Sequence, residues 1–248
     1  MNFADNDCVD TPFSIALLYD REKVLNFFVD YSQNVLKKPF KIEDHKALLI
    51  SVTRRGKNLK LFEKVIGMGA DVNWTDNCGF TALMGACSSG NFEMCRRLIE
   101  LSANVNAVND NEYTALHYLC NNGDDNAEIL ELLLENGAHI HMNASYLYSA
   151  LHIAVHSVSL KTVKKLLSAG INPNCFNYTL ETPLHILFTC MGKDENDVLS
   201  IAKELVEAGA DIHLKGWDFK TPYEIFSASM RFRKVAEYFN SLNLDRVP

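Results

Sequence analysis

Two short sequence motifs recur along the chain in one register, and this register restricts the fold more than any other feature. The first motif reads FTALMGAC, YTALHYLC, YSALHIAV, ETPLHILF and KTPYEIFS, and the Thr or Ser that opens it recurs after 33, 35, 33 and 39 residues. The second reads GADVN, SANVN, GAHIH, GINPN and GADIH in the same phase. Motifs that recur at a nearly fixed spacing of this kind predict a fold built from stacked structural repeats.

The segments between the motifs have helical periodicity. Between Phe92 and Ile99 the apolar residues recur at steps of three and four, as on one face of a helix. Thr182 suits an N-cap, and Pro183 suits the first helical position because its missing N–H is not needed there. Each unit is therefore predicted to hold a helix, a turn, a second helix and an extended turn. One such pair cannot bury its apolar face alone, so neighbouring units must stack.

These motifs resemble the ankyrin repeat, which carries TPLH (here 182–185) and a Gly-Ala-Asp-Val-Asn-like turn at this period. The resemblance implies an all-α ankyrin-repeat solenoid with projecting β-hairpin-like loops, forming one domain over residues 1–248. The terminal units are expected to be degenerate, with Thr11–Tyr31 in the first and Lys220–Leu242 as the final cap. The approximate units are 9–40, 41–75, 76–108, 109–143, 144–176, 177–215 and 216–248.

The chain departs from the family pattern two residues before each Thr or Ser. The family usually has Gly there, where the backbone wants positive φ. Only Gly79 keeps it, and the other units have Glu112, Leu147, Leu180 and Phe219. The shape of those turns is therefore open, and their side chains are predicted to be displayed. The 39-residue gap also predicts a six-residue insertion, placed at Gly192–Val198.

Composition and charge exclude several classes. The formal net charge of -7 argues against nucleic-acid binding and against a polybasic membrane-surface role. The first ten residues do not form a signal peptide, and no run of apolar residues is long enough to span a membrane. Seven cysteines without a CxxC motif predict reduced thiols in the cytoplasm or nucleus. Cys87, Cys95 and Cys120 are expected in the core.

No catalytic or metal-binding motif is found. His117, His152 and His185 could be metal or acid–base residues, or could bond to the backbone and the neighbouring Thr or Ser; the resemblance implies the second. Stacked repeats place equivalent atoms about 10 Å apart, whereas metal–nitrogen bonds are about 2 Å. His139, His141 and His213 are not expected to converge on a metal either. The chain is predicted to be a non-enzyme without a cofactor.

Aromatic residues gather just before each Thr or Ser. The resemblance implies that these turns project as fingers beside a concave partner-binding face, and aromatic anchors are enriched in binding hot spots. Exposed positions of the first helices are expected to join them, while Leu83, Leu116, Leu151 and Leu184 are expected in the core. The predicted partner-binding residues are Trp74, Phe80, Tyr113, Tyr118, Tyr146, Tyr148, Ile153, Tyr178, Trp217 and Phe219, with Ile186 as a further exposed helix position.

Two alternatives stay open at this surface. Each ring could instead pack against the next finger. Acidic and amide residues beside the rings would suit a partner with basic and apolar side chains, but Asn and Asp are also common in turns for backbone reasons.

One modification site is implied by the resemblance. Leu98–Asn106 fits the pattern Leu-x4-Ala-x-Val-Asn, whose last Asn is a target of an asparaginyl hydroxylase in ankyrin repeats. Asn106 is therefore a candidate, with bracing of its own turn as the alternative.

The expected function is a monomeric, non-catalytic module that binds one or more proteins with a basic or apolar surface, and neither nucleic acid nor membrane directly. Two alternatives are a substrate-recognition or adaptor subunit of a ubiquitin ligase, and a stoichiometric inhibitor of a transcription factor or kinase. A ligase-binding box would be expected after the last repeat, and none is visible before Pro248.

Overall fold

The helices are arranged in consecutive pairs along one axis. The computed structural model describes residues 42–123, 126–190 and 192–244. Six helix pairs lie in these ranges, which confirms the predicted all-α solenoid, whereas the predicted first unit (9–40) lies outside them. The pairs are α3 (Ile42–Arg55) with α4 (Leu59–Gly67), α5 (Ala82–Ser88) with α6 (Phe92–Glu100), α7 (Ala115–Asn121) with α8 (Ala127–Glu135), α9 (Ala150–Ser157) with α10 (Leu160–Ser168), α11 (Pro183–Phe188) with α12 (Glu195–Glu207), and α13 (Pro222–Ser227) with α14 (Arg233–Leu244).

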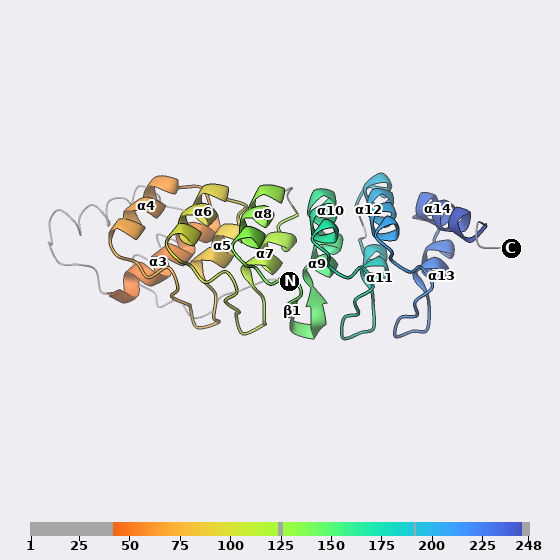
Figure 1. Ribbon diagram of the computed structural model, residues 1–248, viewed down its shortest axis with the longest axis horizontal. Helices are drawn as coiled ribbons and strands as arrows, with labels where there is room; N and C mark the ends of the chain where they lie inside the picture. Colours follow the sequence, from red (N-terminus) through yellow and green to blue (C-terminus); the bar gives the residue numbers. More distant parts are fainter. Residues whose placement is uncertain (1–41, 124–125, 191, 245–248) are drawn as a thin grey trace.

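The two helices of each pair belong to two different layers. Each first helix contacts the first helix of the next pair, and each second helix likewise contacts the next second helix (Figure 1). Extended loops hang from one edge of the first layer. One of these loops holds a short antiparallel pairing of β1 (Asn143–Ala144) with β2 (Tyr148–Ser149), in which Asn143 lies opposite Ser149. The 3-10 turn η2 (Ser145–Leu147) joins the two strands.

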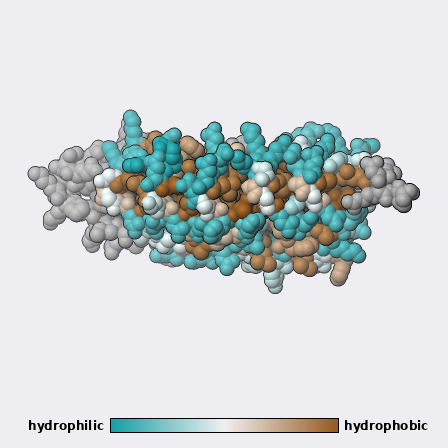
Figure 2. Space-filling view, in the orientation of Figure 1, coloured by the Kyte–Doolittle hydropathy of each residue, from teal (hydrophilic) through white to brown (hydrophobic). Residues whose placement is uncertain are grey.

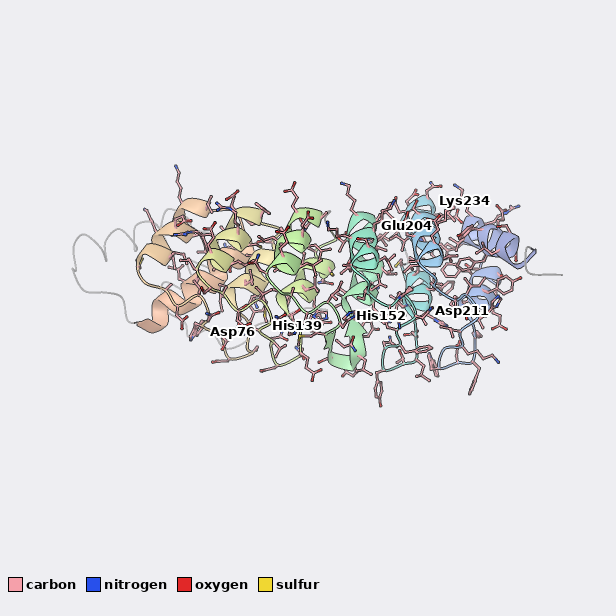
Figure 3. All side chains as sticks on the ribbon, viewed as in Figure 1. Asp76, His139, His152, Glu204, Asp211 and Lys234 are labelled. Carbon is pink, nitrogen blue, oxygen red and sulfur yellow. The ribbon has the colours of Figure 1, made fainter. Side chains whose placement is uncertain are left out.

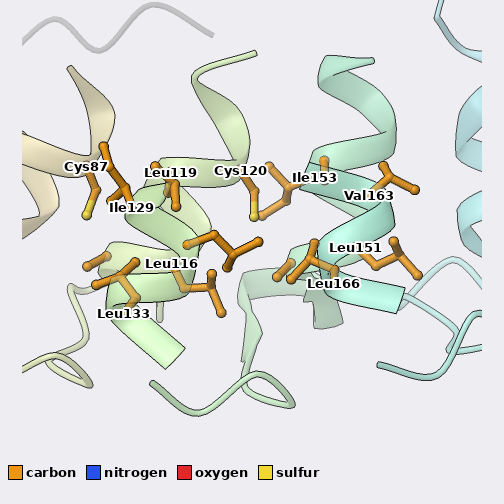
Figure 4. Close-up of a cluster of buried hydrophobic side chains, with 14 of the residues drawn as sticks. Cys87, Leu116, Leu119, Cys120, Ile129, Leu133, Leu151, Ile153, Val163 and Leu166 are labelled. Atoms are coloured by element: carbon orange, nitrogen blue, oxygen red, sulfur yellow. The ribbon is translucent and has the colours of Figure 1, made fainter. Parts of the chain in front are cut away.

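The core runs continuously between the two layers. Leu116, Leu151 and Leu166 are among the buried side chains where neighbouring pairs meet (Figure 4). The leucines of the first motif are buried as predicted: Leu83, Leu116, Leu151 and Leu184. Cys87, Cys95 and Cys120 are also buried, and burial raises the pKa of the Cys120 thiol to about 12. These cysteines therefore act as small core residues, as predicted.

Every first helix from α5 onward begins with a capping box. At α9 the His152 N–H donates to Ser149 Oγ (3.3 Å), and the Ser149 N–H donates back to His152 Nδ1 (3.2 Å). The same reciprocal arrangement is built with Glu224 at α13. Because both amide groups would otherwise lack an intrahelical partner, the box stabilises helices of only six to eight residues.

The histidines of these boxes also link neighbouring units. The Nε2 atom of each ring donates to a backbone carbonyl in the loop that precedes the next first helix: His117 to Met142 (3.1 Å), His152 to Glu181 (3.0 Å) and His185 to Lys220 (3.2 Å). Each Nδ1 accepts a backbone N–H, so each ring is neutral with its proton on Nε2. The prediction that these histidines tie adjacent turns together is confirmed.

The segment predicted as an insertion (192–198) contains the start of α12, which has 13 residues against nine in α10. Its first residue reaches the last helix pair: Glu195 Oε1 accepts the Lys234 N–H at 2.7 Å. Lys234 Nζ donates to Asn196 Oδ1 at 2.6 Å. The longer helix thus satisfies a free amide at the N-terminus of α14, the second helix of the last described pair.

Replacing Leu184 by Ala should lower the free energy of unfolding by about 2–5 kcal/mol, because it opens a cavity in a fully buried site. Urea denaturation followed by circular dichroism measures this change. Leu180→Ala is the matched control, since Leu180 is half-exposed, and should change it by about 0.5 kcal/mol at most. Equal losses in the two variants would contradict the assignment of the core.

Acid should destabilise the protein through its buried histidines. Burial lowers the pKa of His117 and of His152 to about 4, against about 6.5 for an unfolded chain. Between these values the unfolded chain binds protons that the folded chain does not. Each of these two histidines therefore contributes up to about 3 kcal/mol to the free energy of unfolding. This contribution is complete above about pH 6.5 and is lost as the pH falls toward 4.

Urea midpoints measured at several pH values in this window should decrease steadily as the pH is lowered from about 6.5 to about 4. In the folded protein, the NMR signals of the His117 and His152 rings should stay unchanged from about pH 7 to about pH 5. Midpoint titration of either ring near pH 6.5 would show that these rings are not held neutral by burial.

Candidate protein-binding surface

The loops before the first helices project along one edge of the solenoid (Figure 1). We call them fingers and name them by their residues: 75–81, 109–114, 143–149, 177–182 and 216–221. Side chains within the fingers hold their shape. Asn109 Oδ1 accepts the N–H groups of Asn111 (3.1 Å) and Tyr113 (2.8 Å), and Asp76 Oδ1 does the same for Cys78 and Phe80. Asn and Asp therefore have a structural role in these two fingers.

Neighbouring fingers are joined by backbone hydrogen bonds. The Asp110 N–H donates to Cys78 O (2.9 Å), and the Ser145 N–H donates to Asn111 O (2.9 Å). The Tyr178 N–H donates to Tyr146 O at 2.8 Å. The first four fingers consequently form one connected band, which lowers the ordering cost of binding along it.

The finger tips keep a left-handed backbone without glycine. The φ angle is 74° at Gly79, and it is 58° at Glu112 and at Leu147, 53° at Leu180 and 60° at Phe219. The turn shape left open by the sequence is thus the glycine-like one. A side chain in this conformation costs about 1–2 kcal/mol, and such strain is concentrated at functional sites.

Tyr146 adds a second left-handed residue to finger 143–149, with φ of 60°. It directly precedes Leu147, so two consecutive side chains at this tip are held in a costly backbone conformation. Both side chains point into solvent rather than into the core.

Of the residues predicted to bind a partner, those that are exposed all lie in the three C-terminal fingers, 143–149, 177–182 and 216–221. The exposed fraction is 72% for Tyr146, 71% for Tyr178, 66% for Trp217 and 78% for Phe219. The Tyr146 and Tyr178 rings meet edge to face, 6.4 Å apart between centroids. At the lower edge of the space-filling view, the tips toward the C-terminal side include brown, hydrophobic atoms (Figure 2).

The aromatic residues of the N-terminal fingers are packed instead. Phe80 is buried, and the Arg54 guanidinium lies over its ring at 4.1 Å, so the expectation that Phe80 is displayed is wrong. Tyr118 meets Phe80 edge to face at 5.0 Å, and its hydroxyl accepts from Asn109 Nδ2 at 2.9 Å. Burial raises the Tyr118 pKa to about 12. Tyr113 is half-buried against Tyr118.

Two further predictions of exposure are wrong. Ile153 and Ile186 are 6% and 3% exposed, because both pack in the core that runs through the stacked helix pairs. Trp74 and Tyr148 are intermediate: both are half-buried and pack against the core.

Leu147 and Leu180 were not among the predicted binding residues, although both are half-exposed at the tips. Their signal in the sequence is the missing glycine, which predicts a displayed side chain at those positions.

Asn106 braces the turn between two units. Its Nδ2 donates to Gly137 O at 2.8 Å, and its Oδ1 accepts the His139 N–H at 2.8 Å. Asn73 and Asn174 make the equivalent pair of bonds one unit before and two units after. The bracing role is therefore present, and hydroxylation of Asn106 stays a prediction.

Neither a metal cluster nor a membrane span is found in the described ranges. No three side chains of His, Cys, Asp or Glu lie together there in a way that could hold an ion. None of the helices formed by residues 42–123, 126–190 and 192–244 is both long and apolar enough to cross a bilayer.

Comparison with protein families gives two matches that together cover more than half of the chain. The model described as "Ankyrin repeats (3 copies)" matches residues 48–144, and the model described as "Ankyrin repeat" matches residues 146–178.

Curated relatives match over shorter segments. A fowlpox virus (strain NVSL) protein named as ankyrin repeat protein FPV232 is 39% identical over 61 residues, which are 24% of this chain and 12% of that protein. Potassium channel KOR2 of Oryza sativa subsp. japonica is 42% identical over 62 residues, 25% of this chain and 8% of the channel. Protein fem-1 homolog A-A of Mus musculus is 32% identical over 86 residues, 35% of this chain and 12% of that protein. The chain thus spans only a small part of these relatives.

The strain at the tips can be measured at Phe219. Phe219→Gly should raise the free energy of unfolding by about 1 kcal/mol relative to Phe219→Ala, because Gly adopts positive φ without a clash between its side chain and the backbone. Urea unfolding of the two variants gives this difference. A glycine variant that is less stable than the alanine variant would show that the tip is not strained.

Proposed function

Since the chain belongs to the ankyrin repeat family, whose repeats indicate a protein–protein interaction module, we propose that it binds a partner protein through its C-terminal finger tips. The binding residues would be Tyr146, Leu147, Tyr178, Leu180, Trp217 and Phe219, which we call the aromatic row. The observation that carries the proposal is the exposure of this row on successive fingers.

Physical chemistry favours this row as a binding surface. When a partner covers a large exposed aromatic side chain, apolar surface is removed from water, which favours binding. Trp and Tyr are also enriched at binding hot spots. The backbone at Leu147, Leu180 and Phe219 is strained, so these side chains are displayed at a cost in stability. Such a cost is understandable if the displayed side chains contact a partner.

The histidines support a scaffolding role over a catalytic one. Ser149 Oγ lies 2.8 Å from His152 Nδ1 and 3.3 Å from Cys175 Sγ, a grouping that superficially resembles a nucleophile with its base. However, His152 Nδ1 already accepts a backbone N–H, and its Nε2 proton is donated to Glu181 O. Burial also raises the Cys175 pKa, which disfavours the reactive thiolate. Ankyrin repeats are generally non-catalytic, in keeping with this arrangement.

Replacing Tyr146 and Trp217 together by Ala should abolish partner capture with little change in stability, because both side chains are mostly exposed. The measurement is affinity purification with the full chain as bait, followed by mass spectrometry, with urea unfolding of each bait in parallel.

Met230→Ala is the matched control, since Met230 is almost fully exposed but lies outside the fingers. Proteins that are captured by the original chain and by the control, and lost with the double variant, support the proposal. Equal capture by all three baits excludes the aromatic row as the binding surface.

A further inference from the structure

The negative charge of this protein is concentrated in the middle of the chain. Residues 98–160 contain eight Asp or Glu residues and no Lys or Arg, although the formal net charge of all 248 residues is only -7. The remainder of the chain is therefore close to neutral. Along the sequence, an acidic central zone is therefore flanked by two nearly balanced ones.

Within this zone, part of the acidic charge lies on the second helix layer. Glu128, Glu131 and Glu135 belong to α8, where Glu131 pairs with Lys165 of α10 at 2.8 Å. The second helices lie on the side of the molecule away from the fingers, as the labels of Glu204 and Asp76 show in Figure 3. These carboxylates are thus separated from the finger band.

The other part is displayed at a finger tip. Asp110 and Glu112 are exposed in finger 109–114. Fingers 75–81 and 143–149 on either side contain no basic residue. The Arg54 guanidinium of α3 is stacked on the Phe80 ring of finger 75–81. The acidic tip therefore lacks a basic neighbour within its own and the adjoining fingers.

The acidic tip directly adjoins the aromatic row. The Ser145 N–H and the Ser145 Oγ both donate to Asn111 O, at 2.9 and 2.8 Å, so the two fingers touch. Beyond this junction each carboxylate has a partner within its own finger: Glu181 Oε2 accepts from Thr179 Oγ1 at 2.7 Å, and Asp218 lies 3.6 Å from Lys220 in the last finger. Along the band, an acidic stretch thus gives way to an apolar one.

We propose that the fingers from 109–114 to 216–221 bind one continuous segment of a partner protein, with Lys or Arg side chains over Asp110 and Glu112 and apolar or aromatic side chains over the aromatic row. This inference rests on the proposed function and specifies its partner. Fingers about 10 Å apart, the usual distance between packed helices, give a length of about 30 Å from finger 109–114 to finger 216–221. That length corresponds to about 20 helical residues or about nine extended ones.

The charge arrangement disfavours other occupants. Nucleic acid and anionic lipid surfaces would be repelled by Asp110 and Glu112. A second copy bound symmetrically through the same band would bury these carboxylates against fingers without a surplus of basic groups. A segment with basic and apolar residues can pair its basic side chains with Asp110 and Glu112 and pack its apolar side chains on the aromatic row.

The test is selection from a phage-displayed library of random peptides of about 20 residues, with the full chain as target. Enriched peptides should carry a Lys or Arg cluster next to a cluster of aromatic or aliphatic residues. Enrichment of acidic peptides, or of apolar peptides without basic residues, would overturn the inference.

The enriched peptide is then synthesised and its affinity measured by fluorescence anisotropy. Asp110→Lys with Glu112→Lys should weaken binding by about tenfold at low salt, and added salt should reduce this difference. Glu128→Lys with Glu135→Lys makes the same change of charge on α8 and should alter the affinity by less than about twofold. Trp217→Ala with Phe219→Ala should also weaken binding strongly.

The outcomes separate this inference from the proposed function. If the finger charge variant binds like the original chain while the Trp217 and Phe219 variant does not, the inference fails and the proposed function stands. If neither variant changes the affinity, both fail. Concentration-dependent dimerisation in analytical ultracentrifugation that is lost on changing Trp217 and Phe219 would make a second copy the occupant and overturn the inference.

Discussion

The capping box at the start of each first helix from α5 onward is the interaction on which the rest of the structure depends. Helices of six to eight residues are unstable in isolation, so α9 and α11 exist only because their free amide groups are capped and their apolar sides are stacked. The same histidines that complete the boxes donate to carbonyls of the next finger. Helix formation, stacking and finger position are therefore coupled through single side chains, and the binding surface is held by the scaffold itself.

The two ends of the finger band use aromatic residues in opposite ways. Toward the N-terminus, Phe80, Tyr113 and Tyr118 pack against one another at the finger base. Toward the C-terminus, the aromatic row faces solvent. One architecture thus contains both a structural and a displayed use of the same residue types. Leu147, Leu180 and Phe219 occupy left-handed tip positions and are exposed, whereas Phe80 and Tyr113 directly precede the capping Thr and are buried or half-buried.

Much of the fold could be predicted from the sequence because its signals are local. The helix starts and the buried leucines follow from short-range chemistry repeated in register, and the bracing histidines were implied by the resemblance to ankyrin repeats; each is confirmed. The exposure of the proposed binding residues was predicted less well. Phe80, Ile153 and Ile186 were assigned to the surface, yet all three are buried. Burial of a side chain in a solenoid depends on the neighbouring unit, which the sequence of its own unit does not describe.

The sequence alone determined the repeat, its period and the absence of glycine at most finger tips, since these are properties of the order of residues. Only the tertiary structure decided that the glycine-free tips keep φ near 60°, because that turn is closed by bonds inside each folded finger, such as Leu180 N–H to Asn177 O and Phe219 N–H to Gly216 O. It also decided which aromatic rings are displayed. Stacking covers the rings at the finger bases and leaves those at the C-terminal tips in water, and exposure of that kind arises only when the units are packed together.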